Sequence, residues 1–263
     1  MSERTLLPRQ RQDMIQDLVR TQRFATVREL ASAVGVSAMT VRRDLESLAS
    51  DGHVHRVYGG AKVAAPTPSD ATVPEQRYAE RMMENRDAKI RLARQAARDV
   101  ADGDTVALDG STTAVYLAHQ LRDRAITVVT NNLLIVNELA GGAPPVFVPG
   151  GMVRETTHTL VGEGAVAGLE AFNADVAFFS CTGIHAEAGL SDSNAEEVAV
   201  KRALFRIASR RVALIDASKF GRTSLLNLLP LTDVAFIVSD AEPDGSLRRA
   251  VASAGAGLRV ADA

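Results

Sequence analysis

A proline-rich segment at residues 64–74, AAPTPSDATVP, divides this chain into two parts of different character. The segment contains three prolines and few large apolar side chains, which is typical of a linker. At 263 residues, the chain is long enough for two ordinary domains. We therefore predict a first domain over residues 1–63, a linker over residues 64–86 and a second domain over residues 87–263.

Short apolar runs alternate with helical stretches throughout the second part. The runs are rich in Val and Ile, as in strands buried on both faces, and lie at residues 105–108, 126–129, 146–148, 176–179, 212–215 and 234–238. The helical stretches lie at residues 87–100, 112–121, 132–139, 195–209 and 246–254. This alternation predicts an α/β fold with a doubly wound, mostly parallel sheet and helices on both faces.

Three short helical patterns and a hairpin pattern make up the first part. Apolar residues at helical spacing predict one helix over residues 10–20, a second that Thr26 caps and a third that Ser37 caps, with a turn at Gly35. Residues 53–57 and 61–64 then predict two strands joined by a turn. This order is typical of a winged helix-turn-helix, whose third helix lies in the major groove of DNA.

The third predicted helix and the hairpin carry the side chains that we expect to contact DNA. The start of the helix meets base edges and phosphates, its arginines pair with phosphate or guanine, and the wing meets the backbone. The expected contacts are Ser37, Ala38, Met39, Thr40, Arg42, Arg43, Arg56 and Tyr58. The alternative is an ordinary three-helix bundle with solvated arginines.

Charge and composition are compatible with this interpretation. Residues 1–63 hold 10 Lys and Arg against 7 Asp and Glu, while the remainder holds 20 against 25, which together give the net charge of -2. The polar start and the absence of a long apolar run predict a cytoplasmic protein with no membrane contact. The five histidines form no ligand pattern, so we expect no metal site and no cofactor, and the single cysteine, Cys181, is expected to be a buried strand residue.

Polar and glycine-rich sequences follow several of the predicted strands. DGSTT at residues 109–113 combines a glycine turn, three hydroxyls and a helix start, which favours anion binding, although Ser and Thr are also ordinary helix caps. Asn131, Gly150, Gly151 and Lys219 follow other predicted strands. Because ligands bind at the carboxyl ends of parallel strands, these segments predict one binding site. Glu196 and Glu197 either bind ligand hydroxyls or only complement a helix dipole.

The segment VRELASAVGVSAMTVRRDLESLASDGHVHRVYGGA resembles the N-terminal signature of the DeoR family of bacterial transcriptional regulators. It departs from the family pattern at Tyr58, where many relatives have His. The second part, with DGSTT, VTNN, PGG, GLSDSNAEEVAVKRA and DASKF, resembles the sensor domain of the same family, which is similar to the ribose-5-phosphate isomerase and glucosamine-6-phosphate deaminase fold. The resemblance implies a phosphorylated sugar as effector, bound by Asp109, Gly110, Ser111, Thr112, Thr113, Asn131, Gly150, Gly151, Arg154, Lys201 and Lys219.

Three functions are compatible with these features. The first is a repressor of carbohydrate or sugar-phosphate metabolism genes that binds double-stranded operator DNA as a homo-oligomer, a dimer or tetramer, under the control of a phosphorylated sugar. The second is an isomerase or deaminase with a DNA-binding head, for which Asp109 and Glu163 are conceivable bases; the catalytic pattern expected of such enzymes is missing, so we predict no enzyme activity. The third is an architectural DNA binder with a vestigial effector site.

Overall fold

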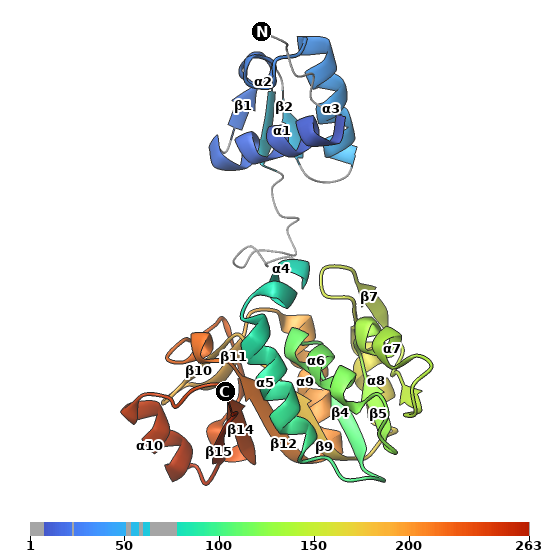
Figure 1. The fold of residues 1–263 in the computed structure, drawn as a ribbon, viewed down its shortest axis with the longest axis vertical. Helices are drawn as coiled ribbons and strands as arrows, with labels where there is room; N and C mark the ends of the chain where they lie inside the picture. The colour runs from blue at the N-terminus through green and yellow to red at the C-terminus, as the bar shows by residue number, and fades with distance from the viewer. Residues whose placement is uncertain (1–7, 23, 51–53, 58–59, 64–77, 263) are drawn as a thin grey trace. The chain divides into compact units, whose positions relative to one another are not determined.

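The computed structural model describes residues 8–22, 24–50, 54–57, 60–63 and 78–262, and its chain divides into two compact units between Pro74 and Glu75 (Figure 1). The first unit contains α1 Pro8–Gln22, β1 Phe24–Thr26, α2 Val27–Val34, α3 Ala38–Ser50, β2 Val54–Val57 and β3 Gly60–Val63. Its three strands form an antiparallel sheet in the order β1-β3-β2. Within the described residues, no helix has the length and hydropathy needed to cross a lipid bilayer.

Local sequence explains where α2 begins and ends. Thr26 and Glu29 form a capping box, in which the Thr26 hydroxyl accepts from the Glu29 backbone N–H and the Glu29 carboxylate accepts from the Thr26 N–H. Gly35 ends the helix with a φ of 67°, a left-handed conformation that favours glycine. Both features confirm the predicted boundaries of this helix.

An apolar core and one ion pair hold the first unit together. Ile15, Leu30, Val41 and Leu45 are all buried and contact one another across the three helices. Asp44 faces inward from α3 and is buried, and the Arg11 guanidinium lies 2.6 Å from it. The sequence did not predict strand β1, which is three residues long and pairs with β3.

A seven-stranded parallel sheet forms the centre of the second unit, in the order β15-β14-β12-β9-β4-β5-β6. Its strands are β4 Thr105–Leu108, β5 Thr127–Thr130, β6 Val146–Phe147, β9 Ala174–Phe179, β12 Ala208–Ile215, β14 Phe236–Ser239 and β15 Gly257–Val260. The parallel α/β fold that the sequence predicts is therefore confirmed.

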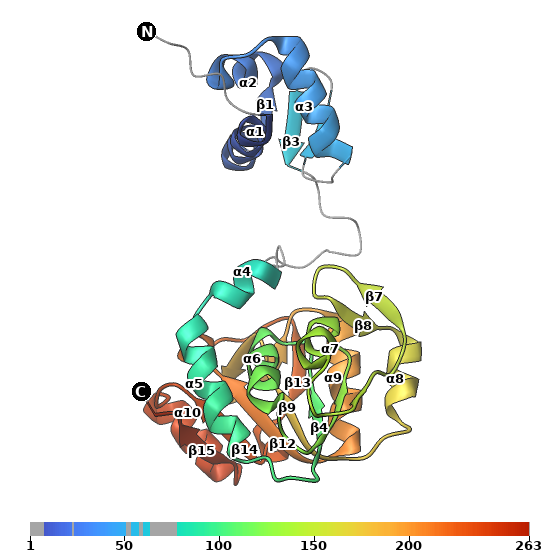
Figure 2. The ribbon, with the colours of Figure 1, turned by 45° about the vertical axis from the view of Figure 1, so that its right-hand side comes forward.

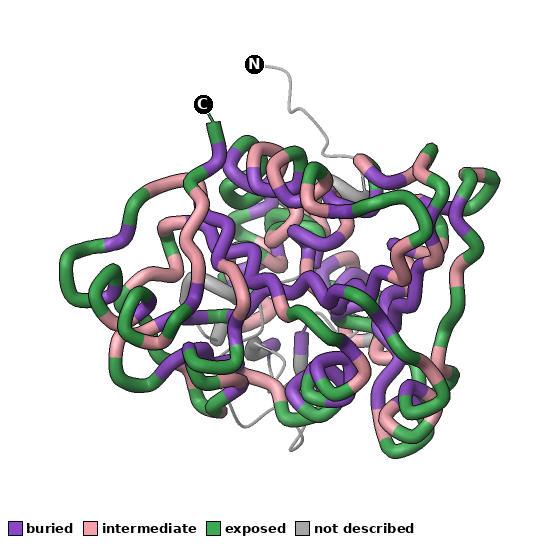
Figure 3. Tube along the Cα trace, turned by 90° about the horizontal axis from the view of Figure 1, so that it is seen from below, coloured by how far each residue is buried: buried purple, intermediate pink, exposed green. Residues whose placement is uncertain are grey.

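Helices cover both faces of this sheet (Figures 1 and 2). They are α4 Tyr78–Met83, α5 Arg86–Ala97, α6 Thr112–Leu121, α7 Leu133–Leu139, α8 Glu163–Leu169, α9 Ala195–Ile207 and α10 Gly245–Ser253. Leu108 and Phe178 face one side and pack with α5, α6 and α7. Ala107 and Phe179 face the other side, where α8, α9 and α10 pack. Figure 3 shows buried residues in the centre of this layered unit and exposed residues on its periphery.

Short antiparallel strands add two small sheets at the edges of the unit. β7 Met152–Arg154 and β8 Thr159–Val161 form a hairpin, and β10 Gly183–His185, β11 Gly189–Asp192 and β13 Leu226–Leu229 form a second sheet. The sequence predicted none of these strands, nor β15 and α8. They are three to seven residues long with mixed polarity, so no apolar run or long helical period marks them.

Several boundaries differ from the predicted ones by a few residues, and two of the differences change how the chain is divided. α4 lies within the predicted linker, at residues 78–83, because Tyr78 is buried against the second unit and anchors the helix there. The predicted helix over residues 195–209 ends at Ile207, and β12 begins at the next residue without a loop. Residues 208–213 pair with β9 and so continue the chain as a strand, although Ser209, Arg210 and Arg211 are polar.

Candidate functional site

α3 presents its predicted DNA-contacting face to solvent. Ser37 caps the helix, since its hydroxyl accepts from the Thr40 N–H at 3.2 Å. Met39 is 71% exposed, and Arg42 and Arg43 are exposed on the side away from the buried Val41. Ala38 is also exposed. Of the two hairpin predictions, Arg56 is described in β2 by its backbone only, and Tyr58 lies outside the described residues.

The carboxyl ends of the central strands gather the polar residues of the second unit. Asp109 follows β4, Asn131 follows β5, Ser180 follows β9 and Asp216 follows β12. These four strands are consecutive neighbours in the parallel sheet, so their ends lie along one edge. Residues that are distant in the sequence therefore form one cluster, which we call the strand-end site.

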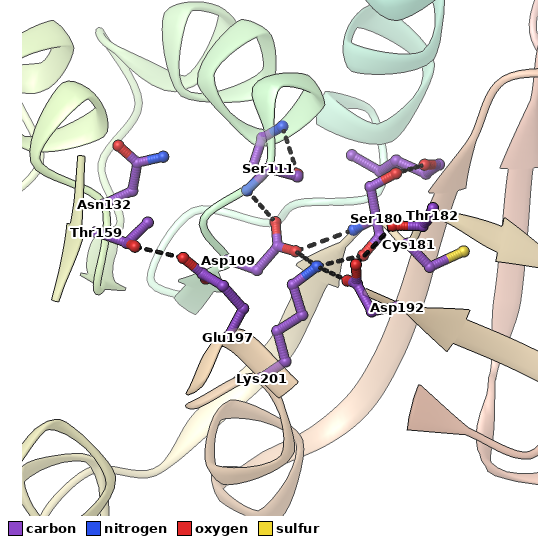
Figure 4. A network of polar contacts seen from close by, with 12 residues as sticks. Asp109, Ser111, Asn132, Thr159, Ser180, Cys181, Thr182, Asp192, Glu197 and Lys201 are labelled. Atoms are coloured by element: carbon purple, nitrogen blue, oxygen red, sulfur yellow. Dashed lines mark hydrogen bonds and ion pairs between the residues drawn. The ribbon is translucent and has the colours of Figure 1, made fainter. Parts of the chain in front are cut away.

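Asp109 lies at the centre of the strand-end site (Figure 4). Its carboxylate is 1% exposed and accepts from the Ser111 N–H at 3.0 Å and the Ser180 N–H at 3.1 Å. Lys201 from α9 places its ammonium 3.2 Å from the same carboxylate. Asp109 therefore fixes the loop after β4, the end of β9 and the middle of α9 relative to one another.

Lys201 bridges two buried carboxylates. Its ammonium also lies 2.6 Å from Asp192 and donates to the Ser180 carbonyl at 2.8 Å. Burial alone would lower the pKa of Lys201, but the charges of Asp192 and Asp109 outweigh it and raise that pKa. Burial likewise acts to raise the pKa of Asp192, and the neighbouring Lys201 charge outweighs it and lowers that pKa. The pair is therefore ionised, and all three ammonium donors have protein partners.

The DGSTT loop leads into α6. Ser111 caps the helix by accepting from the Ala114 N–H at 3.2 Å, while Thr112 and Thr113 are buried in its first turn. A Cβ on Gly110 would lie 2.6 Å from the Thr159 methyl group, so the loop packs closely against β8. Ser111 is thus a helix cap, one of the two roles that the sequence left open, and anion binding by this loop stays a prediction.

Glu197 lies next to this loop, at the start of α9. Its Oε1 accepts hydrogen bonds from the hydroxyls of Thr157 at 2.7 Å and Thr159 at 2.5 Å. Its Oε2 would lie 3.1 Å from a Cβ on Gly110. The sequence left Glu197 undecided between ligand binding and helix-dipole stabilisation, and Thr157 and Thr159 were not predicted, because only the β7–β8 hairpin brings them here.

Two consecutive asparagines follow β5 and have different partners. Asn131 donates from Nδ2 to the Leu160 carbonyl at 3.1 Å, and its buried Oδ1 accepts no hydrogen bond among the described residues. Asn132 caps α7 by accepting from the Leu134 N–H at 2.8 Å, and its Nδ2 donates to the Tyr78 hydroxyl at 3.1 Å. Asn131 was predicted as an effector contact; its position at a strand end leaves that prediction open.

The PGG turn and Arg154 lie beside the β7–β8 hairpin. Gly150 and Gly151 have φ values of 79° and 110°, and a Cβ on Gly151 would lie 2.7 Å from the Val161 carbonyl oxygen. Arg154 donates to the Thr157 hydroxyl at 3.3 Å and lies 3.8 Å from Glu196. Arg154 therefore joins the Glu197 side of the strand-end site through Thr157, whereas the two glycines shape the backbone.

Lys219 lies at the far side of the same site. Its ammonium donates to the Ser180 hydroxyl at 2.7 Å and lies 3.6 Å from Asp216. Burial acts to raise the pKa of Asp216, but the Lys219 charge and hydrogen bonds from Ser218 outweigh it and lower that pKa. The side chain of Lys219 is 18% exposed, against 8% for Lys201, so Lys219 is the more accessible cation.

Other chemistry in the described part of the chain is limited. No group of three or more His, Cys, Asp or Glu residues there is arranged to hold a metal ion. Cys181 is buried as the sequence predicts, but it lies two residues after β9 and not in a strand, and burial raises the pKa of its thiol to about 12. The thiol is therefore protonated and poorly nucleophilic at neutral pH.

Comparisons with known proteins match both units. Residues 11–67 match the model of the DeoR-like helix-turn-helix domain, and residues 84–241 match that of the DeoR C terminal sensor domain. Among solved structures, ribose 5-phosphate isomerase A from Methanocaldococcus jannaschii is similar with a TM-score of 0.40 and 17% identity, covering 52% of this chain and 55% of that one. eIF2B beta from Chaetomium thermophilum is similar with a TM-score of 0.45 and 14% identity, and the match covers 94% of this chain and 69% of that one.

Similar proteins extend over nearly the whole chain. The HTH-type transcriptional regulator GlpR of Haloferax volcanii is 31% identical, covering 95% of this chain and 96% of its own. The Glycerol-3-phosphate regulon repressor of Escherichia coli is 31% identical, and the match covers 90% of this chain and 93% of that protein. The Transcriptional repressor AccR of Agrobacterium fabrum is 33% identical, and the match covers 88% of each chain. This chain belongs to the DeoR family of transcriptional regulators.

Proposed function

We propose that this protein is a DNA-binding repressor of carbohydrate or sugar-phosphate metabolism genes, and that a phosphorylated sugar or polyol bound at the strand-end site changes its affinity for DNA. Relatives that match almost end to end are a regulator and two repressors, one of them of a glycerol-3-phosphate regulon. Their names support regulation, and not catalysis, as the activity of this chain.

One observation carries the sensor half of the proposal. Hydroxyls, an accessible cation and a buried amide oxygen that accepts from no described residue meet at the carboxyl ends of parallel strands, where this type of sheet binds ligands. Lys219 and the loop of residues 109–113 suit the anionic group, and Asn131 suits a ligand hydroxyl. Lys201 has no donor left for a ligand, so we assign it a positioning role in which it orients Asp109.

The first unit supplies the DNA-binding half. An exposed Met39 and two exposed arginines on a capped helix suit insertion into the major groove. Base edges lie within reach of the first turn, and phosphates within reach of the arginines. Such heads usually read two half-sites, so we also propose a dimer or tetramer, which light scattering of the purified chain measures directly.

Enzyme activity is less well supported by this geometry. A sugar isomerase needs a carboxylate free to remove a carbon-bound proton. Asp109 already accepts from two backbone N–H groups and pairs with Lys201, and Glu163, the other candidate, is exposed at the start of α8. Neither carboxylate is placed as such a base.

Fluorescence anisotropy with DNA from upstream of the encoding gene tests the proposal. Binding should weaken steeply with salt, because the head displaces counterions from phosphates. Glycerol 3-phosphate, ribose 5-phosphate or another phosphorylated sugar should change the DNA affinity, while the unphosphorylated compound should not. Binding that no phosphorylated compound alters, or an absence of salt-dependent binding to any duplex, contradicts the proposal.

A further inference from the structure

Helix α4 is attached to the strand-end site by several hydrogen bonds. The buried Tyr78 accepts from Asn132 through its hydroxyl, and its ring packs edge-on against His158 with centroids 5.8 Å apart. The backbone carbonyl of Met82 accepts from the Tyr116 hydroxyl at 2.9 Å. α4 is therefore held at the same edge of the sheet as the ends of β4 and β5, as both ribbon views show (Figures 1 and 2).

Arg81 on this helix carries two hydrogen-bond donors that no described residue accepts from. Its guanidinium lies over the Tyr78 ring, 5.3 Å from the centroid, in a cation–π contact. Its Nε and Nη2 are shielded from solvent and make no hydrogen bond among the described residues. Buried donors of a charged group are costly when they are left unsatisfied, so this arrangement is incomplete without a further acceptor.

Several cations converge around Arg81. The ammonium of Lys89, on α5, is buried and donates to the Arg81 carbonyl. Burial lowers the pKa of Lys89 to about 8, and the charges of Lys219 and Arg81 act in the same direction, whereas Asp216 and Glu84 oppose them. The Tyr78 hydroxyl is likewise near enough to Arg81, Asp109 and Glu197 for their charges to affect its pKa, which burial raises to about 12. Converging positive charge of this kind favours an anion.

The junction between α4 and α5 is tied to the Lys219 loop as well. Asn85 donates from Nδ2 to Asp216 at 3.0 Å and to the Ser218 hydroxyl at 3.1 Å. Asp216 in turn lies 3.6 Å from the Lys219 ammonium. Arg81 and Lys219 thus reach the strand-end site from two segments that are connected to each other.

We infer that Arg81 is a ligand-binding residue of the strand-end site, and that its Nε and Nη2 hold the anionic group of the effector together with Lys219. This inference rests on the proposed function and adds a link between effector binding at the strand-end site and the segment that precedes α4. α4 is the first described element of the second unit, so an effector bound by Arg81 fixes the sensor end of the segment that leads to the DNA-binding head. A ligand can shift a conformational equilibrium only through such differential contacts.

The test compares variants of the full-length chain by thermal shift with three probes: inorganic phosphate, glycerol 3-phosphate and ribose 5-phosphate. Arg81→Met keeps the stem that packs on Tyr78 but removes both donors, and Arg81→Lys keeps the charge without the planar fork. The probe that stabilises the wild type should bind Arg81→Met about ten- to a hundredfold more weakly, as expected for a lost charge-assisted hydrogen bond. Arg86→Met, an exposed arginine of the neighbouring helix, is the matched control and should bind normally.

Hydrogen exchange of the amides in α4 gives a second measurement that a purely structural role would not change. The probe should slow exchange at residues 78–83 in the wild type and in Arg86→Met, but not in Arg81→Met. Equal probe affinity and equal protection in Arg81→Met would overturn the inference and leave the proposed function intact. If no phosphorylated probe stabilises the wild type, the proposed function fails and the inference fails with it.

Discussion

The ammonium of Lys201 lies 2.6 Å from a carboxylate oxygen of Asp192, and both side chains are almost completely removed from solvent. Replacing Lys201 with Met would leave Asp192 and Asp109 buried without their counter-charge. Because an uncompensated buried charge is costly, we expect the free energy of unfolding to fall by about 3–5 kcal/mol, measured by urea denaturation.

A matched control separates this effect from a general loss of charge on α9. Arg206→Met, in the last turn of the same helix, removes an exposed arginine that lies 4.0 Å from Glu170. Its effect should be within about 0.5 kcal/mol of zero. A similarly small effect for Lys201→Met would show that the negative charge of the two carboxylates is compensated in another way, for example by water or protonation.

Replacing Gly110 with Ala should disturb the loop after β4. The new Cβ would lie 2.6 Å from the Thr159 methyl group and 3.1 Å from Glu197 Oε2, so these side chains must move. We expect a loss of about 1–3 kcal/mol in the free energy of unfolding, as for other overpacked sites, together with weaker effector binding. Gly164→Ala, whose Cβ would meet its nearest neighbour at an ordinary contact distance of 3.6 Å, controls for an added methyl group without a clash. Unchanged effector affinity in Gly110→Ala would argue against this loop as a binding element.

Lys89 should make stability depend on pH in the alkaline range. Burial, with the nearby charges of Lys219 and Arg81, lowers its pKa to about 8 despite the opposing Asp216 and Glu84, whereas an unfolded lysine has a pKa of about 10.4. Between these values the unfolded chain binds more protons, so the free energy of unfolding contributed by this group rises with pH, by at most about 3 kcal/mol.

The measurement is urea denaturation of the wild type and Lys89→Met at pH 7 and pH 10. Groups common to both proteins cancel in the comparison, so the wild type should gain stability relative to the variant as the pH rises. Identical pH dependence in the two proteins would mean that the ammonium titrates normally. Phosphate should reduce the difference, because an anion nearby restores the charged form of the lysine.

Arg43 should contribute to DNA binding through phosphate contact. Its side chain is exposed on α3, beside the exposed Arg42. If it neutralises one phosphate, Arg43→Ala should weaken binding to all duplexes alike and reduce the slope of log affinity against log salt by about 0.9. Arg206→Ala, in the second unit, should leave the slope unchanged. A loss confined to one DNA sequence would instead assign Arg43 to a base contact.

Local sequence rules identified the regular elements well. α2 begins after Thr26 and ends at Gly35 as predicted, because capping and left-handed turns depend on one or two residues. The Val-rich runs became the buried central strands, since strands covered on both faces must be apolar throughout. The strand-end site followed from the same pattern, because topology alone brings the ends of parallel strands together.

Elements that depend on tertiary contacts could not be predicted in this way. α4 has only six residues, and its position depends on Tyr78, whose partner Asn132 is distant in the sequence. Similarly, nothing near Lys201 in the sequence shows that it meets Asp109. The family resemblance identified Lys201 as a site residue, but only the coordinates show that its donors are already occupied.

The side-chain amide of Asn132 forms hydrogen bonds with two helices, one through its oxygen and one through its nitrogen. Its oxygen accepts from the first turn of α7, and its nitrogen donates to the tyrosine that anchors α4. The amide therefore cannot rotate without breaking one of these contacts. A displacement of α4 that parted Tyr78 from Asn132 would leave this buried nitrogen in need of another acceptor, so such a displacement carries an energetic cost.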